Sequence, residues 1–443
     1  MNDSTQNIRG TSAAEIARSI EEAIREGKLP PGSKMPTVRN LATDLDVSPG
    51  TVAASYKTLR ARGLLLTRGR LGTRVAPRPP LRVPGGAGRP VPETVRNLAD
   101  GNPDPALFPR LERVVSAIDW TPRLYGEAPN DPALVELATK AFHDEGIPVG
   151  PVAVVGGALD AIERILRAQL RAGDRIAVED PAYSGILDLV RSLGLVPVPM
   201  AIDDRGPTPG SLFYALDTGA KACLITPRAQ NPTGAALDEE RAVELREIID
   251  QFPETLVIED DHAGPVSGVR AVSICRKDRP RWAITRSVAK WLGPDLRLAI
   301  LTGDPGTVSR VQGRQMIGTG WVSNILQQIV VGLWKDPEVR ESLRQTEQLY
   351  AGRRTAFIDA LAERGIPALG RSGLNVWVPV PDESRIVQAL FDRGFAVAGG
   401  ERFRVDSEPA IRITTATLRP DEIETLVEAL ASGLTQMTNT RTG

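Results

Sequence analysis

Four short segments of the sequence contain residue types that could carry out imine chemistry on a bound carbonyl compound. The segment from Ser287 to Arg297 brings a hydroxyl, the amine of Lys290 and a guanidinium close together, and residues 258–262 (IEDDH) add carboxylates. The other two segments are Gly156-Gly157-Ala158 and Asn231-Pro232-Thr233-Gly234. A lysine amine forms a Schiff base with an aldehyde, a carboxylate can face a ring nitrogen, and helix-opening amides suit a phosphate. Each segment alone is typical of a solvated surface, but their order and spacing together favour a site for pyridoxal phosphate.

These segments follow apolar runs that are typical of buried strands. The runs are Val152–Val155, Arg175–Val178, Ala222–Thr226, Thr255–Ile258, Ala283–Thr285 and Leu298–Leu301, with helical stretches such as Leu159–Gln169 and Glu239–Asp250 between them. Alternation of strand and helix predicts parallel pairing with right-handed crossovers. Because ligands of such sheets bind at the carboxyl ends of the strands, we expect the candidate residues to meet at one edge of an α/β sheet.

Composition excludes several classes of protein. The chain has 443 residues, of which 41% are hydrophobic and 25% are charged, as in ordinary soluble globular proteins. No run approaches the ~18 apolar residues of a membrane span, and the first ten residues lack the apolar core of a secretory signal. Two cysteines and two histidines cannot build a disulfide scaffold, a zinc cluster or a His-rich metal site. We therefore expect a cytoplasmic protein without a metal site.

The charge is divided unevenly along the chain. Residues 1–92 contain fifteen Lys or Arg and seven Asp or Glu, a net charge of +8, whereas the remainder carries −9. A basic block on an acidic body suggests a small module that binds a polyanion, although a chance excess of arginine on a solvated face gives the same count. Residues 77–92 contain six prolines and three glycines. They cannot continue a helix or a central strand, so we expect a linker there.

The residues before this linker follow the pattern of a winged helix-turn-helix. Apolar residues at helical spacing predict three short helices, and Thr37 and Ser48-Pro49 are suitable starts for the second and third. Residues 64–75 read as a β-hairpin around a glycine-rich basic tip. In this geometry the third helix enters the major groove of DNA and its N-terminus meets phosphates.

Residues 27–75 resemble the GntR family of bacterial repressors, because turn, helix and wing signals occur in the order of that family. The resemblance implies binding of a double-stranded DNA operator through Arg39, Ser48, Thr51 and Lys57, together with Gly69 and Arg70 in the wing.

The chain departs from the family pattern at the start of its recognition helix. Family members often carry base-reading side chains at the positions of Pro49, Gly50 and Ala53, so more of the contact is expected from Lys57, Arg60 and the wing. The alternative role of Arg39 is a surface ion pair with Asp44.

Residues 97–435 resemble the fold-type I aminotransferases, and with the N-terminal module the chain resembles the MocR branch of GntR regulators, nearest to the PtsJ-type regulators of vitamin B6 salvage. Shared phrases include GNPDPALFP, VEDPAY, ITPRAQNPTG, IEDDHA and RSVAKWLGPDLRLA. The implied fold class is multidomain: a winged helix-turn-helix linked to an α/β pyridoxal-phosphate transferase fold with a small C-terminal α+β part. The expected boundaries are 1–76 for the DNA-binding domain, 77–96 for the linker and 97–443 for the aminotransferase-like domain, whose larger part covers about 125–330 and whose smaller part covers about 345–443.

The resemblance also implies a role for each candidate residue. Lys290 is the internal aldimine lysine of pyridoxal phosphate, Asp260 pairs with the pyridine nitrogen, Asn231 approaches the 3′-oxygen and Tyr183 stacks on the ring. Gly157, Ala158, Ser287 and Arg297 hold the phosphate, and Tyr125 reaches it from a neighbouring subunit, so a homodimer is implied. Arg412 matches the arginine that grips a substrate carboxylate with a two-pronged contact.

Three of these positions have alternative interpretations. His262 stands where most MocR proteins have a tyrosine near the ring oxygen; an imidazole could donate there, but with a pKa near neutrality it would change the electronics of the cofactor. His262 could instead be a core histidine bonded to a main-chain carbonyl. Arg412 could form an ion pair with Glu401 or Glu408, and Tyr183 could only pack in the core.

Three functions are compatible with the sequence. The first is a transcriptional regulator that senses pyridoxal phosphate, alone or with an amino compound as effector. The second is a working aminotransferase with an added DNA-binding head, and the third is a body that keeps the cofactor only for structure. A metabolic enzyme needs neither a basic winged helix nor a proline-rich linker, so the regulator is favoured, with weak transamination at most. The resemblance further implies that the regulated gene encodes a pyridoxal kinase.

Overall fold

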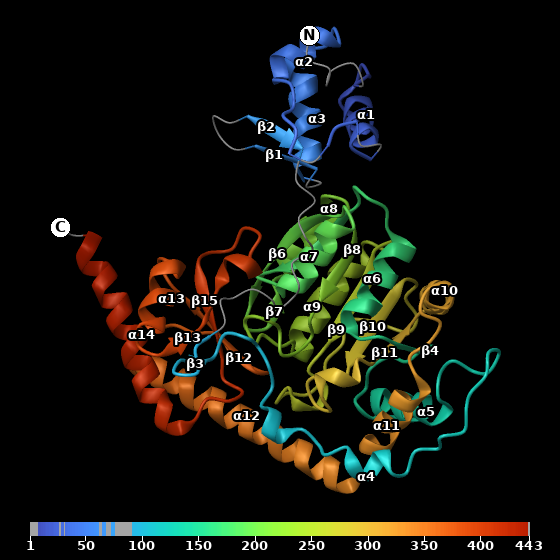
Figure 1. Cartoon of the computed structure of the whole chain (residues 1–443), viewed down its shortest axis with the longest axis vertical. Coiled ribbons are helices and arrows are strands. Elements are labelled where there is room, and N and C mark those ends of the chain that lie inside the picture. Colours follow the sequence, from blue (N-terminus) through green and yellow to red (C-terminus); the bar gives the residue numbers. More distant parts are fainter. Residues whose placement is uncertain are drawn as a thin grey trace. The chain divides into compact units, whose positions relative to one another are not determined.

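The computed structural model describes residues 8–25, 28–30, 32–61, 64–67, 72–75 and 91–441. It divides into two compact units, one containing residues 1–86 and the other containing nearly all of the rest (Figure 1). Most of the expected linker, residues 77–90, and the expected wing residues Gly69 and Arg70 lie outside the described residues.

The first unit contains three helices followed by a two-stranded antiparallel hairpin. They are α1 (Ala13–Arg25), α2 (Val38–Asp44), α3 (Pro49–Ala61), β1 (Leu65–Thr67) and β2 (Thr73–Val75). The Thr37 hydroxyl accepts from the Asn40 N–H at 3.2 Å, and the Ser48 hydroxyl accepts from the Thr51 N–H at 3.1 Å. These caps satisfy amides that would otherwise lack acceptors, and they confirm the two predicted helix starts.

A small apolar core holds the three helices together. Ile16 and Ile20 of α1, Leu41 of α2, and Val52 and Leu59 of α3 are fully buried. Their helical spacing is the pattern that predicted the winged helix-turn-helix, and the order of helices and strands confirms that fold.

The second unit is built on an eight-stranded sheet. Its strands are β4 (Val152–Val155), β5 (Arg175–Asp180), β6 (Val196–Asp203), β7 (Gly206–Pro207), β8 (Ala220–Ile225), β9 (Leu256–Asp261), β10 (Trp282–Ser287) and β11 (Ala299–Gly303), in the order β4-β11-β10-β9-β8-β5-β6-β7. The pairs β5–β8, β8–β9 and β9–β10 are parallel, as the alternation of strands and helices predicted.

The prediction of parallel pairing is wrong for β11 and β4. Strand β11 is antiparallel to β10 and to β4. The physical reason is the connection through residues 288–298, which contains only the short 3₁₀-helix η4 (Pro294–Leu296) and no crossover helix. Without a crossover the chain reverses and pairs with β10 in the opposite direction. Strand β6 was not predicted, because Pro197 and Pro199 argue against a strand.

Helices flank the sheet and bury its central strands (Figure 1). They are α5 (Pro132–Asp144), α6 (Ala158–Gln169), α7 (Ser184–Ser192), α8 (Pro209–Asp217), α9 (Glu239–Asp250), α10 (Pro305–Ile317) and α11 (Asn324–Lys335), with short α4 (Glu112–Val115) before them. Every residue of β9 and β10 is buried, as expected for parallel strands covered on both faces. Among the described residues no helix is both long and apolar enough to span a lipid bilayer.

The long helix α12 (Pro337–Glu363) leads into a smaller C-terminal part. It contains β12 (Asn375–Pro379), α13 (Glu383–Phe391), β13 (Phe395–Ala396), β14 (Ala398–Gly399), β15 (Ala410–Thr414) and α14 (Pro420–Arg441). Strands β12, β15 and β14 form an antiparallel sheet in that order. The fully buried Val376, Ile411, Ile413 and Leu430 belong to its separate core.

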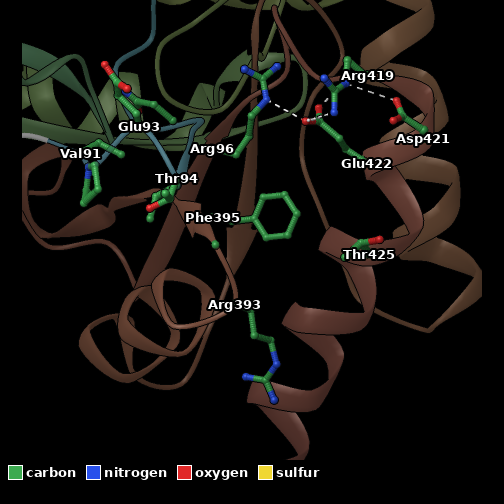
Figure 2. A pocket seen from close by; sticks show the side chains of 14 residues that line it. Val91, Glu93, Thr94, Arg96, Arg393, Phe395, Arg419, Asp421, Glu422 and Thr425 are labelled. Carbon is green, nitrogen blue, oxygen red and sulfur yellow. Dashed lines mark hydrogen bonds and ion pairs between the residues drawn. The ribbon is translucent and has the colours of Figure 1, made fainter.

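The end of the expected linker and the residues that follow it belong to this smaller C-terminal part. Strand β3 (Arg96–Asn97) pairs in parallel with β13, and the Arg96 side chain donates to Glu422 at 2.9 Å. Arg419 also pairs with Glu422, at 3.0 Å. Figure 2 shows these groups in a pocket of about 820 Å³ that is lined by residues 91–97, 393–395 and the start of α14. Arg96 therefore anchors the end of the linker to α14.

A buried ion network fixes the end of β9. Asp261 accepts hydrogen bonds from Arg228 at 2.8 Å and from Arg286 at 2.7 Å, and both guanidinium groups also contact Glu145. Burial alone would raise the pKa of Asp261, but the two guanidinium groups outweigh burial and hold the pKa far below its ordinary value. The network orients the segment that carries Asp260.

We predict that Asp261→Asn destabilises the second unit by about 3–5 kcal/mol, because two buried guanidinium groups lose their shared carboxylate. All six tryptophans lie between residues 120 and 377, so tryptophan fluorescence during urea denaturation reports on this unit. Glu163→Gln is the control, since Glu163 pairs with Arg167 at the surface and such pairs contribute about 0.3–0.5 kcal/mol. Equal midpoint shifts for the two variants would contradict the role of the network.

Candidate cofactor site and nucleic-acid interface

The amine of Lys290 lies just beyond β10 in a partly buried position. Its Nζ donates a hydrogen bond to the main-chain carbonyl of Gly101 at 2.8 Å. Burial, together with the nearby charge of Arg412, lowers the pKa of Lys290 to about 8. An amine with this pKa has a useful neutral fraction near neutral pH, which is the form that attacks an aldehyde.

The carboxylate of Asp260 lies at the end of β9. The side chain is 7% exposed, and within the described residues its Oδ1 has no hydrogen-bond partner. Burial, with the charges of Asp261 and Glu179, raises the pKa of Asp260 to about 7. A buried oxygen without a donor is costly, so this position suits a protonated ring nitrogen that supplies both a hydrogen bond and a positive charge.

A candidate anion-binding position lies where α6 begins. Gly157 precedes the helix with a φ of 113°, and a Cβ at this position would lie 3.3 Å from a terminal nitrogen of Arg297. The first amides of α6, beginning with Ala158, have no acceptor within the helix. Amides and a guanidinium together suit a phosphate, and Ser287 lies at the end of neighbouring β10.

Tyr183 lies in the turn between β5 and α7. Its ring packs against Gly185. A larger residue in place of Gly185 would put its Cβ within 2.6 Å of the Tyr183 ring. The pKa of Tyr183 is raised, mainly by burial. The nearby charge of Arg412 opposes this shift, and the nearby charge of Asp260 adds to it. Tyr183 is partly buried and lies close to the candidate residues Arg412 and Asp260.

Arg412 and Asn231 lie together in another part of the candidate site. Arg412 is 4% exposed, donates to Asn231 Oδ1 at 3.1 Å and also donates to the Ala99 carbonyl. Burial lowers the pKa of Arg412 to about 10, which leaves the group charged at neutral pH. Within residues 91–441 it has no ion pair with Glu401 or Glu408, so the alternative interpretation of Arg412 is not supported. A buried cation without a carboxylate suits an anionic ligand.

His262 is neutral, in contrast to the expectation of a pKa near neutrality. Burial and the nearby charge of Lys290 lower the pKa of His262 to about 4. The sequence could not show this, because the shift depends on packing. Among the described residues no main-chain carbonyl is hydrogen-bonded to the ring of His262, so that bond of the alternative interpretation is not seen.

Tyr125 lies at the surface of the single chain. Its side chain is 92% exposed and contacts Trp321 edge to face, with ring centroids 5.6 Å apart.

The described part of the expected DNA-binding surface is exposed on α2 and α3. Arg39, Ser48 and Lys57 are exposed, and Thr51 is half-buried with its hydroxyl 2.8 Å from that of Ser48. Among the residues described here, Arg39 forms no ion pair with Asp44, so its guanidinium faces solvent.

Sequence reasoning missed three contributors to the cleft. Two are main-chain carbonyls, of Ala99 and Gly101, which bond to Arg412 and Lys290. Their signal in the sequence is only indirect, through the phrase GNPDP that begins at Gly101. The third is Arg402, an exposed side chain that donates to Ser184 at 3.3 Å beside Tyr183.

Comparison with known proteins agrees with this architecture. The family model described as aminotransferase class I and II matches residues 94–430, and that of the bacterial regulatory proteins of the gntR family matches residues 12–75. The chain therefore belongs to the GntR family of DNA-binding regulators, to the MocR type in which the winged helix is joined to an aminotransferase-like domain. Aminotransferases of class I and II are a pyridoxal-phosphate-dependent family, so the resemblance seen in the sequence is confirmed.

Similarity to individual proteins extends over most of the chain. The vitamin B6 salvage pathway transcriptional repressor PtsJ of Salmonella typhimurium is 38% identical over 431 residues, covering 96% of this chain and 99% of the relative. The pyridoxine biosynthesis regulator PdxR of Corynebacterium glutamicum is 26% identical over 368 residues, covering 79% of this chain and 78% of the relative. The crystal structure of Pyrococcus horikoshii kynurenine aminotransferase shares the fold, with a TM-score of 0.71 and 22% identity over 78% of this chain and 92% of that chain.

We predict that the visible absorption band that forms when a lysine joins pyridoxal phosphate is absent in Lys290→Ala and present in Lys277→Ala, whose lysine is exposed. Because only the neutral amine reacts, the rate of band formation should rise with pH and level off above a pH of about 8. Stopped-flow absorbance on the wild-type chain checks this. A rate that keeps rising toward the ordinary lysine pKa of 10.5 would contradict the lowered pKa.

Proposed function

We propose that this chain is a transcriptional regulator that binds pyridoxal phosphate through Lys290 as its effector and controls vitamin B6 salvage, with a pyridoxal kinase gene as its target. In this proposal residues 1–76 bind the operator, 77–96 form the linker and 97–443 sense the ligand. The support is the agreement between the cleft and the chemistry of pyridoxal phosphate, together with the 38% identical relative that is named a vitamin B6 salvage repressor. When bound, the cofactor supplies an aldehyde and an electron-withdrawing ring.

The observation that carries the proposal is the position of residues 97–101, which follow the expected linker. The carbonyl of Gly101 accepts from Lys290, and the carbonyl of Ala99 accepts from Arg412. Between them and the linker, Leu98 bonds to Ala396 at 2.8 Å and to Thr414 at 2.9 Å. The segment that leads to the DNA-binding head therefore contacts both side chains that would bind ligand.

Ligand binding would change these contacts. A Lys290 nitrogen that has joined an aldehyde has fewer N–H groups to donate to Gly101, and an anion at Arg412 competes with the Ala99 carbonyl. A ligand shifts a conformational equilibrium only through its different affinity for the two states. The hydrogen bonds to Ala99 and Gly101 would be kept in the ligand-free state and lost in the ligand-bound state, which provides a difference in affinity. The linker would transmit the resulting change in backbone position to the DNA-binding head.

A homodimer is part of the proposal. Trp120, Leu124, Tyr125 and Ile317 are 60–92% exposed, and Tyr125 contacts Trp321. Exposed apolar groups of this size are typical of a protein interface. In a dimer, Tyr125 of one subunit would approach the cleft of the other, and the spacing of the two heads would set the spacing of the operator half-sites.

We expect Arg39→Ala to weaken binding of the chain to DNA from its own upstream region, because an exposed guanidinium on α2 is lost. The slope of log Kd against log salt should fall by about 0.9 for each phosphate contact removed. Arg18→Ala, an exposed change on α1, is the matched control. Fluorescence anisotropy at several salt concentrations measures both. Equal effects of the two variants would remove Arg39 from the interface.

We also expect pyridoxal phosphate to change the DNA affinity of the wild-type chain by about fivefold or more, and that of Arg96→Ala much less, because typical coupling between two sites is about 5- to 150-fold. Arg96→Ala removes the anchor to Glu422 at the end of the linker. Arg393→Ala, in the same pocket, is the control (Figure 2).

In the same samples the visible band reports cofactor binding separately. No effect of pyridoxal phosphate on wild-type DNA binding, together with fast multiple turnover of an amino acid with a keto acid, would favour the aminotransferase with an added head over the regulator.

A further inference from the structure

We propose that Thr285 is a positioning residue for the Asp260 carboxylate: when a protonated ring nitrogen faces Asp260, the Thr285 hydroxyl donates a hydrogen bond to the same carboxylate. The carboxylate then accepts from two donors at once. The inference rests on the proposed function. It assigns a side chain that selects a ligand ring containing a nitrogen over a carbocyclic ring of the same shape.

Asp260 and Thr285 lie in register on neighbouring parallel strands. The pairing of β9 with β10 sets Asp260 opposite Thr285, near the carboxyl ends of both strands (Figure 1). Neighbouring strands are about 4.7–4.9 Å apart, and residues in register point to the same face of the sheet. Ser287, two residues further along β10, shares this face because alternate residues of a strand do so. The two side chains are therefore adjacent on the face that carries the candidate site.

Both side chains contain a buried oxygen without a hydrogen-bond partner. Among the described residues, Asp260 Oδ1 and Thr285 Oγ1 are two such atoms. Thr285 is completely buried, and Asp260 is 7% exposed. Burial of a polar group without a partner is unfavourable, so a hydrogen bond between these two groups would remove a cost from both. A hydroxyl supplies the donor, and a carboxylate supplies only acceptors.

The two other carboxylates near Asp260 have donors of their own. Asp261 accepts from two buried arginines. Glu179 accepts from the Thr226 N–H at 2.9 Å and from the side-chain amide of Gln230 at 3.1 Å. Within residues 91–441 none of these donors is bonded to Asp260 Oδ1. The hydroxyl of the residue in register with Asp260 is therefore the donor that the structure leaves for this carboxylate.

The charge state of Asp260 explains why we expect the bond with ligand and not without it. Burial and the neighbouring carboxylates raise the pKa of Asp260 to about 7, so a large fraction of the group is neutral near pH 7. A neutral carboxyl is a weaker acceptor than a carboxylate. The positive charge of a protonated ring nitrogen favours the ionised form. That form accepts a second, charge-assisted hydrogen bond, because its two oxygens offer about four acceptor positions.

Thr285 can make this change without movement of the backbone. Rotation about its Cα–Cβ bond exchanges the hydroxyl and the methyl group between staggered positions. The backbone of β10 is itself fixed, because the strand pairs with β9 on one side and with β11 on the other. A polar group on a fixed strand is held close to its working position, which favours a specific contact.

The test measures the affinity of the full chain for pyridoxal phosphate through the visible band. Thr285→Val replaces the hydroxyl by a methyl group of similar size, and Thr285→Ser retains the hydroxyl. We expect Thr285→Val to bind at least about tenfold more weakly than the wild-type chain, and Thr285→Ser to bind within about threefold of it. Thr346→Val is the matched control and should bind as the wild-type chain does. Its hydroxyl is also buried without a partner, but it lies on α12.

Two further measurements distinguish this role from simple packing. The first repeats the titration with the analogue of pyridoxal phosphate in which a C–H group replaces the ring nitrogen. The wild-type chain and Thr285→Val should bind this analogue equally. The second is urea denaturation of the ligand-free chain, followed by tryptophan fluorescence. The midpoint of Thr285→Val should be unchanged or higher, because the substitution removes a buried hydroxyl that has no partner.

Equal affinities of Thr285→Val and the wild-type chain for pyridoxal phosphate would overturn the inference. The same loss with the analogue, the same loss in Thr285→Ser, or a lower midpoint of ligand-free Thr285→Val would also overturn it, since each indicates a packing role. Without a band in the wild-type chain, the proposed function and this inference fail together. A band and a DNA response to pyridoxal phosphate, with unchanged affinity in Thr285→Val, reject only the role of Thr285.

Discussion

The hydrogen bond from Lys290 to the Gly101 carbonyl is the interaction on which the rest of the molecule depends. It connects the amine that would bind a carbonyl ligand to the segment that leads out of the domain. Arg412 makes the parallel connection to Ala99. Because Lys290 is partly buried, Arg412 is buried, and neither forms an ion pair within residues 91–441, each would gain from a better acceptor than a neutral carbonyl. In the proposed function, ligand binding would therefore be coupled to main-chain position through competition for these two donors.

The part of the candidate site that contains Asp260 follows the same electrostatic principle. Asp260 has a buried oxygen without a donor, next to Asp261, whose charge is satisfied by Arg228 and Arg286. Two adjacent carboxylates thus have opposite environments, and their pKa values move in opposite directions. The Asp261 carboxylate stabilises the domain, and the Asp260 carboxylate is left available to a ligand. The division explains how a site can be reactive within a rigid sheet.

Much of the fold and part of the site could be predicted from the sequence. Apolar runs and cap residues located the strands and helices well, since Thr37 and Ser48 act locally. The polar residues after each run converge because parallel strands end at one edge of a sheet. The antiparallel pairing of β11 was missed because it depends on a connection without a crossover helix. The carbonyls of Ala99 and Gly101 were missed because a main-chain acceptor has no side chain to recognise, and the low pKa of His262 depends on burial that no local pattern encodes.

The acceptors at positions 99 and 101 have a consequence for how such a regulator could diversify. Every residue type has a main-chain carbonyl, so a substitution at residue 99 or 101 keeps the acceptor. Such a substitution changes only the path of the backbone that positions it. Gly101 has a φ of 74°, a conformation that glycine adopts without strain. Under the proposed function, a change of ligand would therefore require different side chains at the site and would leave these two acceptors in place. Recognition and transmission would then evolve as separate properties of one cleft.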